Sequence, residues 1–143
     1  MDIRELCTRY QHAVSNKDLA GVEELFLPDA VIDSPIMGIT GIRDFHAYLF
    51  QQTRQTSARF PNVFEEKTNP PRISLQFSYT FLTQSVALGG IDGIAIFEFD
   101  EIRQRFKSLK IVYDPSGIRK LMESEDIALP QHAITPQDQS DKN

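Results

Sequence analysis

The sequence is poor in the residues that bind metals. Its 143 residues include one cysteine, Cys7, and three scattered histidines. A single cysteine excludes an internal disulfide and a multi-cysteine zinc or iron–sulfur site, and there is no HExxH pair and no glycine-rich phosphate loop. We therefore expect no metal, no cofactor and no bound nucleotide, and a reducing, cytoplasmic setting.

An excess of positive charge and a long apolar run are also missing. Fifteen lysines and arginines stand against twenty acidic residues, for a net charge of -5. This balance argues against nucleic acid as a partner. The N-terminus is charged and amphipathic without an apolar signal core, and no run approaches the roughly 18 apolar residues of a membrane span. We expect a soluble, unexported protein that does not bind membranes.

The length and the 41% hydrophobic content suit a single domain. We place this domain at residues 1–123. From residue 124 onward the composition turns to Glu, Asp, Gln, Ser and Pro, so residues 124–143 are predicted to form a mobile tail.

The first half of the chain is predicted to be mostly helical. Apolar residues at helical spacing predict a helix from Ile3 to about residue 17. Asp18 is placed to cap a second, short helix that runs through Phe26 and is closed by Pro28. Residues 30–32 then predict a brief edge strand. A longer helix is expected from residue 42 to about residue 60, where a proline follows.

In the second half of the chain, apolar and polar residues alternate, which is typical of β-strands. Residues 72–82, 91–101 and 105–114 predict three strands, and residues 62–68 a further one. Gly89 and Gly90 suggest a hairpin turn. Asp114 and Pro115 resemble the start of a helix over residues 116–122. Helices followed by a meander of strands indicate an α+β fold, with the helices packed on one face of a curved, mostly antiparallel sheet.

Several sequence strings resemble a known superfamily. RYQHAVSNKDLAGVEELFLPDAVIDSP, MGITGIRDFHAYL and FEFDEIRQRFKSLKIVYDP are similar to segments of the nuclear transport factor 2-like (NTF2-like) superfamily, especially its SnoaL-like and ketosteroid-isomerase-like branches. The resemblance covers roughly residues 5–120. It implies a cystatin-like α+β roll, in which a cone-shaped sheet wraps around the N-terminal helices and an apolar pocket opens at one end. Homodimers are frequent in the group, and the outer face of this sheet, with Ile94 and Ile96, could supply the contact.

The isomerase mechanism is only partly matched. In ketosteroid isomerases of that branch, a tyrosine on the first helix and a protonated acid form an oxyanion hole, and an aspartate moves the proton. Tyr10 corresponds to the tyrosine. Ser34 stands at the position of the base, with Asp33 one residue earlier, and Ala95 replaces the second acid. We therefore do not infer ketosteroid isomerase activity for this chain from the resemblance.

Asp33 and Tyr10 are the candidate catalytic residues. A carboxylate at an apolar cavity mouth would act as a general base, and a bulge near Ser34 would be needed to turn Asp33 inward. The alternative is an aspartate that only shapes the turn before Pro35. Tyr10 could polarise a ligand oxygen, or it could pack in the core with its hydroxyl satisfied.

Further residues are candidates for ligand binding. His46 lies on the inner stripe of the predicted long helix, where it could shuttle protons or simply fill the core. An aromatic series on the strands could line a pocket for a flat apolar ligand or fill the interior. Its members are Phe77, Tyr79, Phe81, Phe97, Phe99 and Tyr113.

Two functional hypotheses follow. The first is a SnoaL-like protein that binds a small apolar or aromatic metabolite, with proton-transfer chemistry such as isomerisation, cyclisation or dehydration. The second is a non-catalytic ligand-binding or dimerisation module of the same fold. A protein-transport adaptor ranks last, because the sequence shows no exposed hydrophobic patch for a partner peptide.

Overall fold

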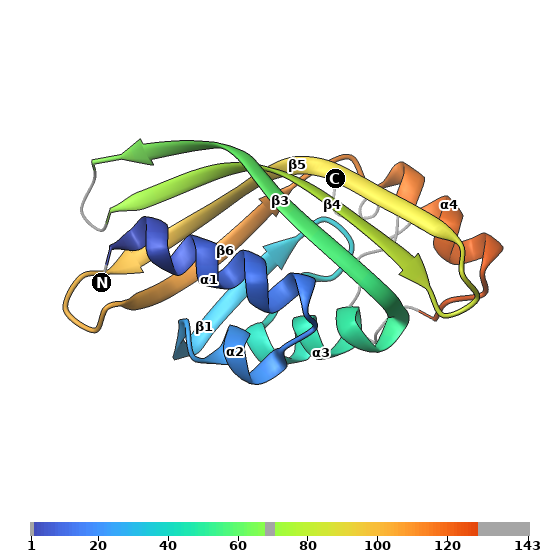
Figure 1. The fold of residues 1–143 in the computed structure, drawn as a ribbon, viewed down its shortest axis with the longest axis horizontal. Helices are drawn as coiled ribbons and strands as arrows, with labels where there is room; N and C mark the ends of the chain where they lie inside the picture. The colour runs from blue at the N-terminus through green and yellow to red at the C-terminus, as the bar shows by residue number, and fades with distance from the viewer. Residues whose placement is uncertain (1, 68–70, 129–143) are drawn as a thin grey trace, which may run out of the picture.

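The computed structural model describes residues 2–67 and 71–128 of the chain. Figure 1 shows the order of the helices and strands along these residues. Their bounds are α1 Ile3–Ser15, α2 Leu19–Glu23, β1 Phe26–Ser34, β2 Gly38–Gly41, α3 Ile42–Gln52, β3 Thr53–Glu66, β4 Arg72–Thr83, β5 Leu88–Asp100, β6 Arg105–Val112 and α4 Ser116–Ser124.

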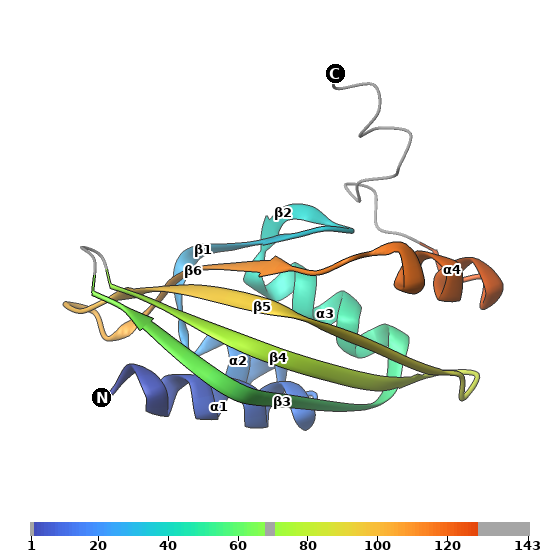
Figure 2. The ribbon, with the colours of Figure 1, turned by 90° about the horizontal axis from the view of Figure 1, so that it is seen from above.

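The strands form one curved, unclosed sheet in the order β2-β1-β6-β5-β4-β3. Only β1 and β6 pair in parallel among these strands, and the other neighbours are antiparallel. The helices α1, α2 and α3 cover one face of the sheet, whereas α4 lies at one end of it (Figures 1 and 2). The predicted α+β cone with a mostly antiparallel sheet is confirmed.

Local sequence explains the first helices. The Asp2 carboxylate accepts a hydrogen bond from the backbone N–H of Arg4 and caps α1, and Asp18 caps α2 through the N–H of Gly21. Such caps satisfy N–H groups that have no partner inside a helix. The buried residues of α1 recur on one stripe, at Leu6, Cys7, Tyr10, Ala13 and Val14.

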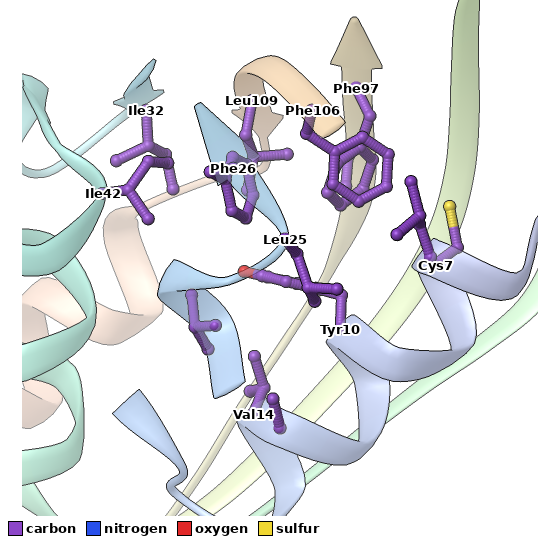
Figure 3. Close-up of a cluster of buried hydrophobic side chains, with 14 of the residues drawn as sticks. Cys7, Tyr10, Val14, Leu25, Phe26, Ile32, Ile42, Phe97, Phe106 and Leu109 are labelled. Carbon is purple, nitrogen blue, oxygen red and sulfur yellow. The ribbon is translucent and has the colours of Figure 1, made fainter. Parts of the chain in front are cut away.

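The core lies between this stripe and the inner face of the sheet. Strand β4 alternates strictly, with Ile73, Leu75 and Phe77 buried and the residues between them less so. Phe97 of β5 and Phe106 of β6 are fully buried, and their ring centroids are 4.5 Å apart. Figure 3 shows these two rings with the side chains of α1 and β1 packed around them.

The predicted long helix over residues 42–60 is wrong in its second half. Helix α3 ends at Gln52, and β3 begins at Thr53. The reason is strand pairing: residues 53–66 run antiparallel to β4, and this tertiary pairing outweighs local helix preference. Pro61 is tolerated because β3 is an edge strand with an irregular register between Arg59 and Asn62. The strand predicted at residues 62–68 is thus the end of β3, which stops at Glu66, and its last residue lies outside the described residues.

Three other predictions also fail. Phe26 begins β1 instead of ending the second helix, and β1 is not an edge strand, because β2 pairs along its outer side. The glycine pair lies inside β5, since the turn between β4 and β5 precedes Leu88. The lack of a side chain at Gly89 allows Phe81 and Leu121 to pack closely against the backbone. A Cβ at this position would meet the ring of Phe81 and come within 2.7 Å of Leu121 Cδ2 on α4.

The C-terminal helix starts at the predicted residue. The Asp114 carboxylate accepts a hydrogen bond from the N–H of Ser116 at 3.0 Å, and α4 runs to Ser124. Of the predicted tail, residues 124–128 are described, and Ile127 lies against the domain. Residues 129–143 lie outside the described residues.

Candidate functional site

An apolar cavity of about 140 Å³ lies between the inner face of the sheet and the helices. The strands contribute side chains that include Ala58, Phe77, Tyr79, Phe81, Ile91, Ala95 and Ile111, and Tyr113 follows the end of β6. The helices contribute Tyr10 and Val14 of α1, Phe45, Tyr48 and Leu49 of α3, and Ile118, Leu121 and Met122 of α4. The lining that the described residues provide contains no Asp, Glu, Lys, Arg or His. A full charge brought into such a cavity would have no counter-charge, so the cavity favours uncharged molecules.

The predicted aromatic series divides into two groups. Four of its members line the cavity, namely Phe77, Tyr79, Phe81 and Tyr113. The other two, Phe97 and Phe99, are buried in the packed core and do not reach the cavity. The alternation of the strands could not separate these groups, because all six residues lie on the same face of the sheet.

Tyr10 and His46 form a buried hydrogen-bonded pair. The Tyr10 Oη and His46 Nε2 atoms are 2.8 Å apart, and His46 Nδ1 lies 2.7 Å from the carbonyl oxygen of Ile42. A carbonyl can only accept, so Nδ1 carries a proton and, in the neutral ring, Nε2 accepts from the Tyr10 hydroxyl. Figure 3 shows Tyr10 extending from α1 toward α3, which carries His46.

Burial keeps both members of this pair uncharged. Desolvation lowers the pKa of His46 from 6.5 to about 4, against a smaller opposing effect of the Ile42 carbonyl. Desolvation also raises the pKa of Tyr10, with a smaller contribution from Tyr79. At neutral pH Tyr10 therefore donates its single phenolic proton in the hydrogen bond to His46. Tyr10 lines the cavity, whereas His46 lies behind it and does not.

The structure does not bring Asp33 into the cavity. Ile32 and Ser34 point inward and are buried, and Ser34 lines the cavity in its place. Asp33 is paired with the exposed residues Ile39 and Lys110 of the neighbouring strands, which puts it on the outer face of the sheet. The irregularity in the pairing of β1 falls before Val31, so no bulge turns Asp33 inward.

Helix α4 is the part of the site that the sequence reasoning missed. None of its residues is fully buried, yet its apolar side chains close one side of the cavity. The spacing of Ile118, Leu121 and Met122 at i, i+3 and i+4 was the available signal, because it gives a short helix one apolar stripe.

Polar contacts hold α4 and the residues after it in place. Glu125 Oε1 accepts hydrogen bonds from Ser85 Oγ at 2.6 Å and from Thr83 Oγ1 at 3.1 Å. The Tyr48 hydroxyl donates to the carbonyl of Ala128 at 2.6 Å. These contacts tie the end of the described chain to the β4–β5 turn and to α3.

Among the residues that the structure describes, no helix is long and apolar enough to cross a membrane.

Comparisons with known proteins agree with this architecture. Residues 1–70 match the model of the SnoaL-like domain. No curated protein matches the sequence of the chain. Several solved structures share the fold, and some of them are named as NTF2-like or ketosteroid isomerase-like proteins.

Three of these structures illustrate the likeness. PrhC from Penicillium brasilianum has a TM-score of 0.74 at 9% identity, covering 84% of this chain and 85% of its own. BvnE pinacolase from Penicillium brevicompactum has a TM-score of 0.71 at 11% identity, covering 90% and 98%. A protein of Shewanella denitrificans, assigned as a SnoaL-like polyketide cyclase, has a TM-score of 0.68 at 15% identity, covering 85% and 96%. Identities this low establish the fold and leave the chemistry open.

Proposed function

Since the chain is SnoaL-like over residues 1–70 and NTF2-like in fold, we propose that it binds a small, uncharged, apolar molecule in its cavity. The observation that carries this proposal is the cavity itself, which is lined by aromatic and aliphatic side chains and enclosed on one side by α4. Sites for small molecules are typically concave and apolar with few polar groups.

The volume of the cavity limits the size of the ligand. Its 140 Å³ is close to the roughly 150 Å³ of an apolar protein cavity that binds benzene. A single ring with a small substituent therefore fits the cavity. A molecule of several fused rings exceeds this volume and requires one wall to move. We expect that wall to be α4, because none of its residues is fully buried and packing therefore holds it least.

Thermal unfolding in the presence of single-ring probes tests the proposal. We expect benzene, cyclohexanone or methylenecyclohexane to raise the melting temperature of the protein. A probe at 100 times its dissociation constant adds about 2.7 kcal/mol of stability. If none of the three probes changes the melting temperature at saturating concentration, the cavity does not bind such molecules and the proposal fails.

A cavity-filling variant links the effect to this site. Ala95 lines the cavity and is 4% exposed, so Ala95→Leu should occupy part of the volume and abolish the probe effect. Ala20→Leu adds the same atoms at an exposed position of α2 and should leave the effect intact. Equal responses of the two variants would place any bound probe elsewhere.

Acid–base catalysis in the same cavity is the second candidate function. The Tyr10–His46 hydrogen bond favours it, and so do the cyclase and pinacolase among the proteins of similar fold. In the hypothesis drawn from the sequence, Asp33 moves the proton and Tyr10 polarises the substrate oxygen. Because Asp33 lies on the outer face of the sheet, we assign the proton transfer to Tyr10 and His46 instead. The reaction would be an isomerisation, a cyclisation or a dehydration.

Exchange of the α-hydrogens of cyclohexanone in heavy water distinguishes these assignments. Catalysis of proton transfer predicts that the protein accelerates deuterium uptake, which is followed by NMR. His46→Gln should remove the acceleration, whereas Asp33→Asn should preserve it and also preserve binding. Loss of the acceleration in Asp33→Asn alone would restore Asp33 as the base, and no acceleration in the wild type would leave binding as the only function.

A further inference from the structure

The hydroxyl groups around the cavity are nearly all committed to protein partners. Tyr10 donates to His46, as described above. Tyr48 donates to the carbonyl of Ala128, and Thr53 Oγ1 donates to the carbonyl of Leu49 at 2.9 Å. Thr83 Oγ1 lies within hydrogen-bond distance of Ser85 and Glu125. These groups have little capacity left to recognise a ligand.

Ser34, which is also buried, accepts a hydrogen bond from the N–H of Met37 at 3.4 Å. Tyr79 differs from all of these groups. It lines the cavity, it is 6% exposed, and its buried hydroxyl has no hydrogen-bond partner among the described residues. Thr53 lies near enough to lower the pKa of Tyr79 slightly, against the larger raising effect of burial, but its own proton goes to Leu49 and no hydrogen bond joins the two hydroxyls. Tyr113 differs, since its side chain is only partly buried. A buried hydroxyl without a partner destabilises the folded state, so native structures rarely keep one without a reason.

We propose that Tyr79 is the polar anchor of the cavity and that the ligand is a single-ring, uncharged molecule with a carbonyl or comparable acceptor oxygen that accepts the Tyr79 proton. The inference rests on the proposed function, because it needs a ligand in the cavity. The phenol oxygen is screened from water by its neighbours, so ligand entry has to shift these side chains to bring an acceptor to it.

The chemistry of the lining sets the limits of this ligand class. A carboxylate or an amine would leave its charge without a partner in a lining that has no charged side chain among the described residues. A pure hydrocarbon fits the apolar walls but leaves Tyr79 unpaired. An acceptor oxygen on an apolar ring satisfies both requirements with one hydrogen bond.

Two probes of matched shape test the assignment. Cyclohexanone and methylenecyclohexane differ only in carrying C=O or C=CH₂ at the same position. Their absolute affinities also reflect the hydration of the ketone, so the informative quantity is the change in dissociation constant caused by Tyr79→Phe. We expect Tyr79→Phe to weaken cyclohexanone binding roughly five- to tenfold. Methylenecyclohexane binding should change by less than about twofold, because it makes no hydrogen bond with Tyr79.

The control variant is Tyr113→Phe, which removes a hydroxyl from another tyrosine of the same lining. It should leave both dissociation constants within about twofold of the wild type. An equal change for the two probes in Tyr79→Phe overturns the assignment of Tyr79 while the proposed function stands. No binding of either probe to the wild type refutes the proposed function itself.

A measurement on the wild-type protein covers the case in which Tyr79→Phe folds poorly. The ¹³C resonance of the cyclohexanone carbonyl moves downfield when its oxygen accepts a hydrogen bond. We expect this downfield shift, relative to cyclohexanone in an alkane solvent, when the ketone is bound. A bound carbonyl that resonates as it does in the alkane overturns the inference without any variant.

Discussion

The two ends of the inner sheet face are built from the same kinds of residue but are packed differently. At one end Phe97 and Phe106 are fully buried, with Tyr10 and Phe26 against them. At the other end Ile91, Ile111 and Tyr113 are only partly buried, and they surround the cavity. Alternation of apolar residues along the strands is common to both ends.

The difference lies in what covers each end. The packed end is covered by α1, whose capped, amphipathic sequence brings five buried residues to the sheet. The cavity end is covered partly by α4, which buries no residue completely and is held by hydrogen bonds at its C-terminal end. The lesson is that a one-faced strand specifies an inner surface, and the covering helix decides whether that surface becomes core or cavity.

Truncation of one aromatic ring at each end gives the largest expected effect. Phe97→Ala should lower the free energy of unfolding by about 3–5 kcal/mol, because it opens a void in close-packed surroundings. Phe81→Ala, at the cavity end, should cost about 2 kcal/mol, since part of that ring already faces empty space. Urea denaturation measures both values. Equal losses would mean that the two ends are packed alike.

The pH dependence of stability tests the buried histidine behind the cavity. The folded-state pKa of His46 is about 4, below its ordinary value of 6.5, so the unfolded chain binds the proton first. Stability should therefore fall as the pH drops from about 6.5 toward 4 and should level off below that range. The loss is on the order of 3 kcal/mol over the full window.

Two histidine variants isolate this contribution. Urea denaturation between pH 7 and pH 5 should show the decline in the wild type and in His12→Gln, which alters an exposed histidine of α1. His46→Gln should flatten it. A decline that persists in His46→Gln would assign the pH dependence to other groups.

The smallest expected effect concerns the attachment of α4. Glu125→Ala removes the acceptor of the hydrogen bonds from Ser85 and Thr83. We expect a loss of about 1 kcal/mol or less in global stability, because the site is partly exposed. Amide hydrogen exchange in residues 116–128 should accelerate while exchange in α1 stays unchanged. Glu123→Ala, at an exposed position of α4, is the matched control, and identical exchange in the two variants would argue against the Glu125 attachment.

The sequence predicted those elements whose signal is local. The apolar stripe of α1, the cap at Asp18 and the alternation in β4 and β5 define helices and strands without reference to the rest of the chain. Residues 53–60 were assigned to the wrong class, because their strand exists only through pairing with β4. The order of the strands in the sheet is likewise a tertiary property.

The candidate site was less predictable than the fold. Tyr10 and four of the six aromatic residues do line the cavity, because inward-facing positions follow from periodicity. The outward direction of Asp33 depended on the register of β1, which a one-residue shift would have reversed. The Tyr10–His46 contact joins residues from two helices that no local pattern connects.

The parallel pairing of β1 with β6 has a consequence for how the protein folds. β6 is the last strand among the residues that the structure describes, yet it lies beside the first, and Phe26 is paired with Phe106. The β1–β2 pair therefore cannot join the rest of the sheet until a loop containing most of the chain has closed, which costs entropy before any contact repays it. Refolding should be slow for a protein of this size, in the range of milliseconds to seconds. The cavity walls are completed in the same late step, because Ser34 of β1 is part of them.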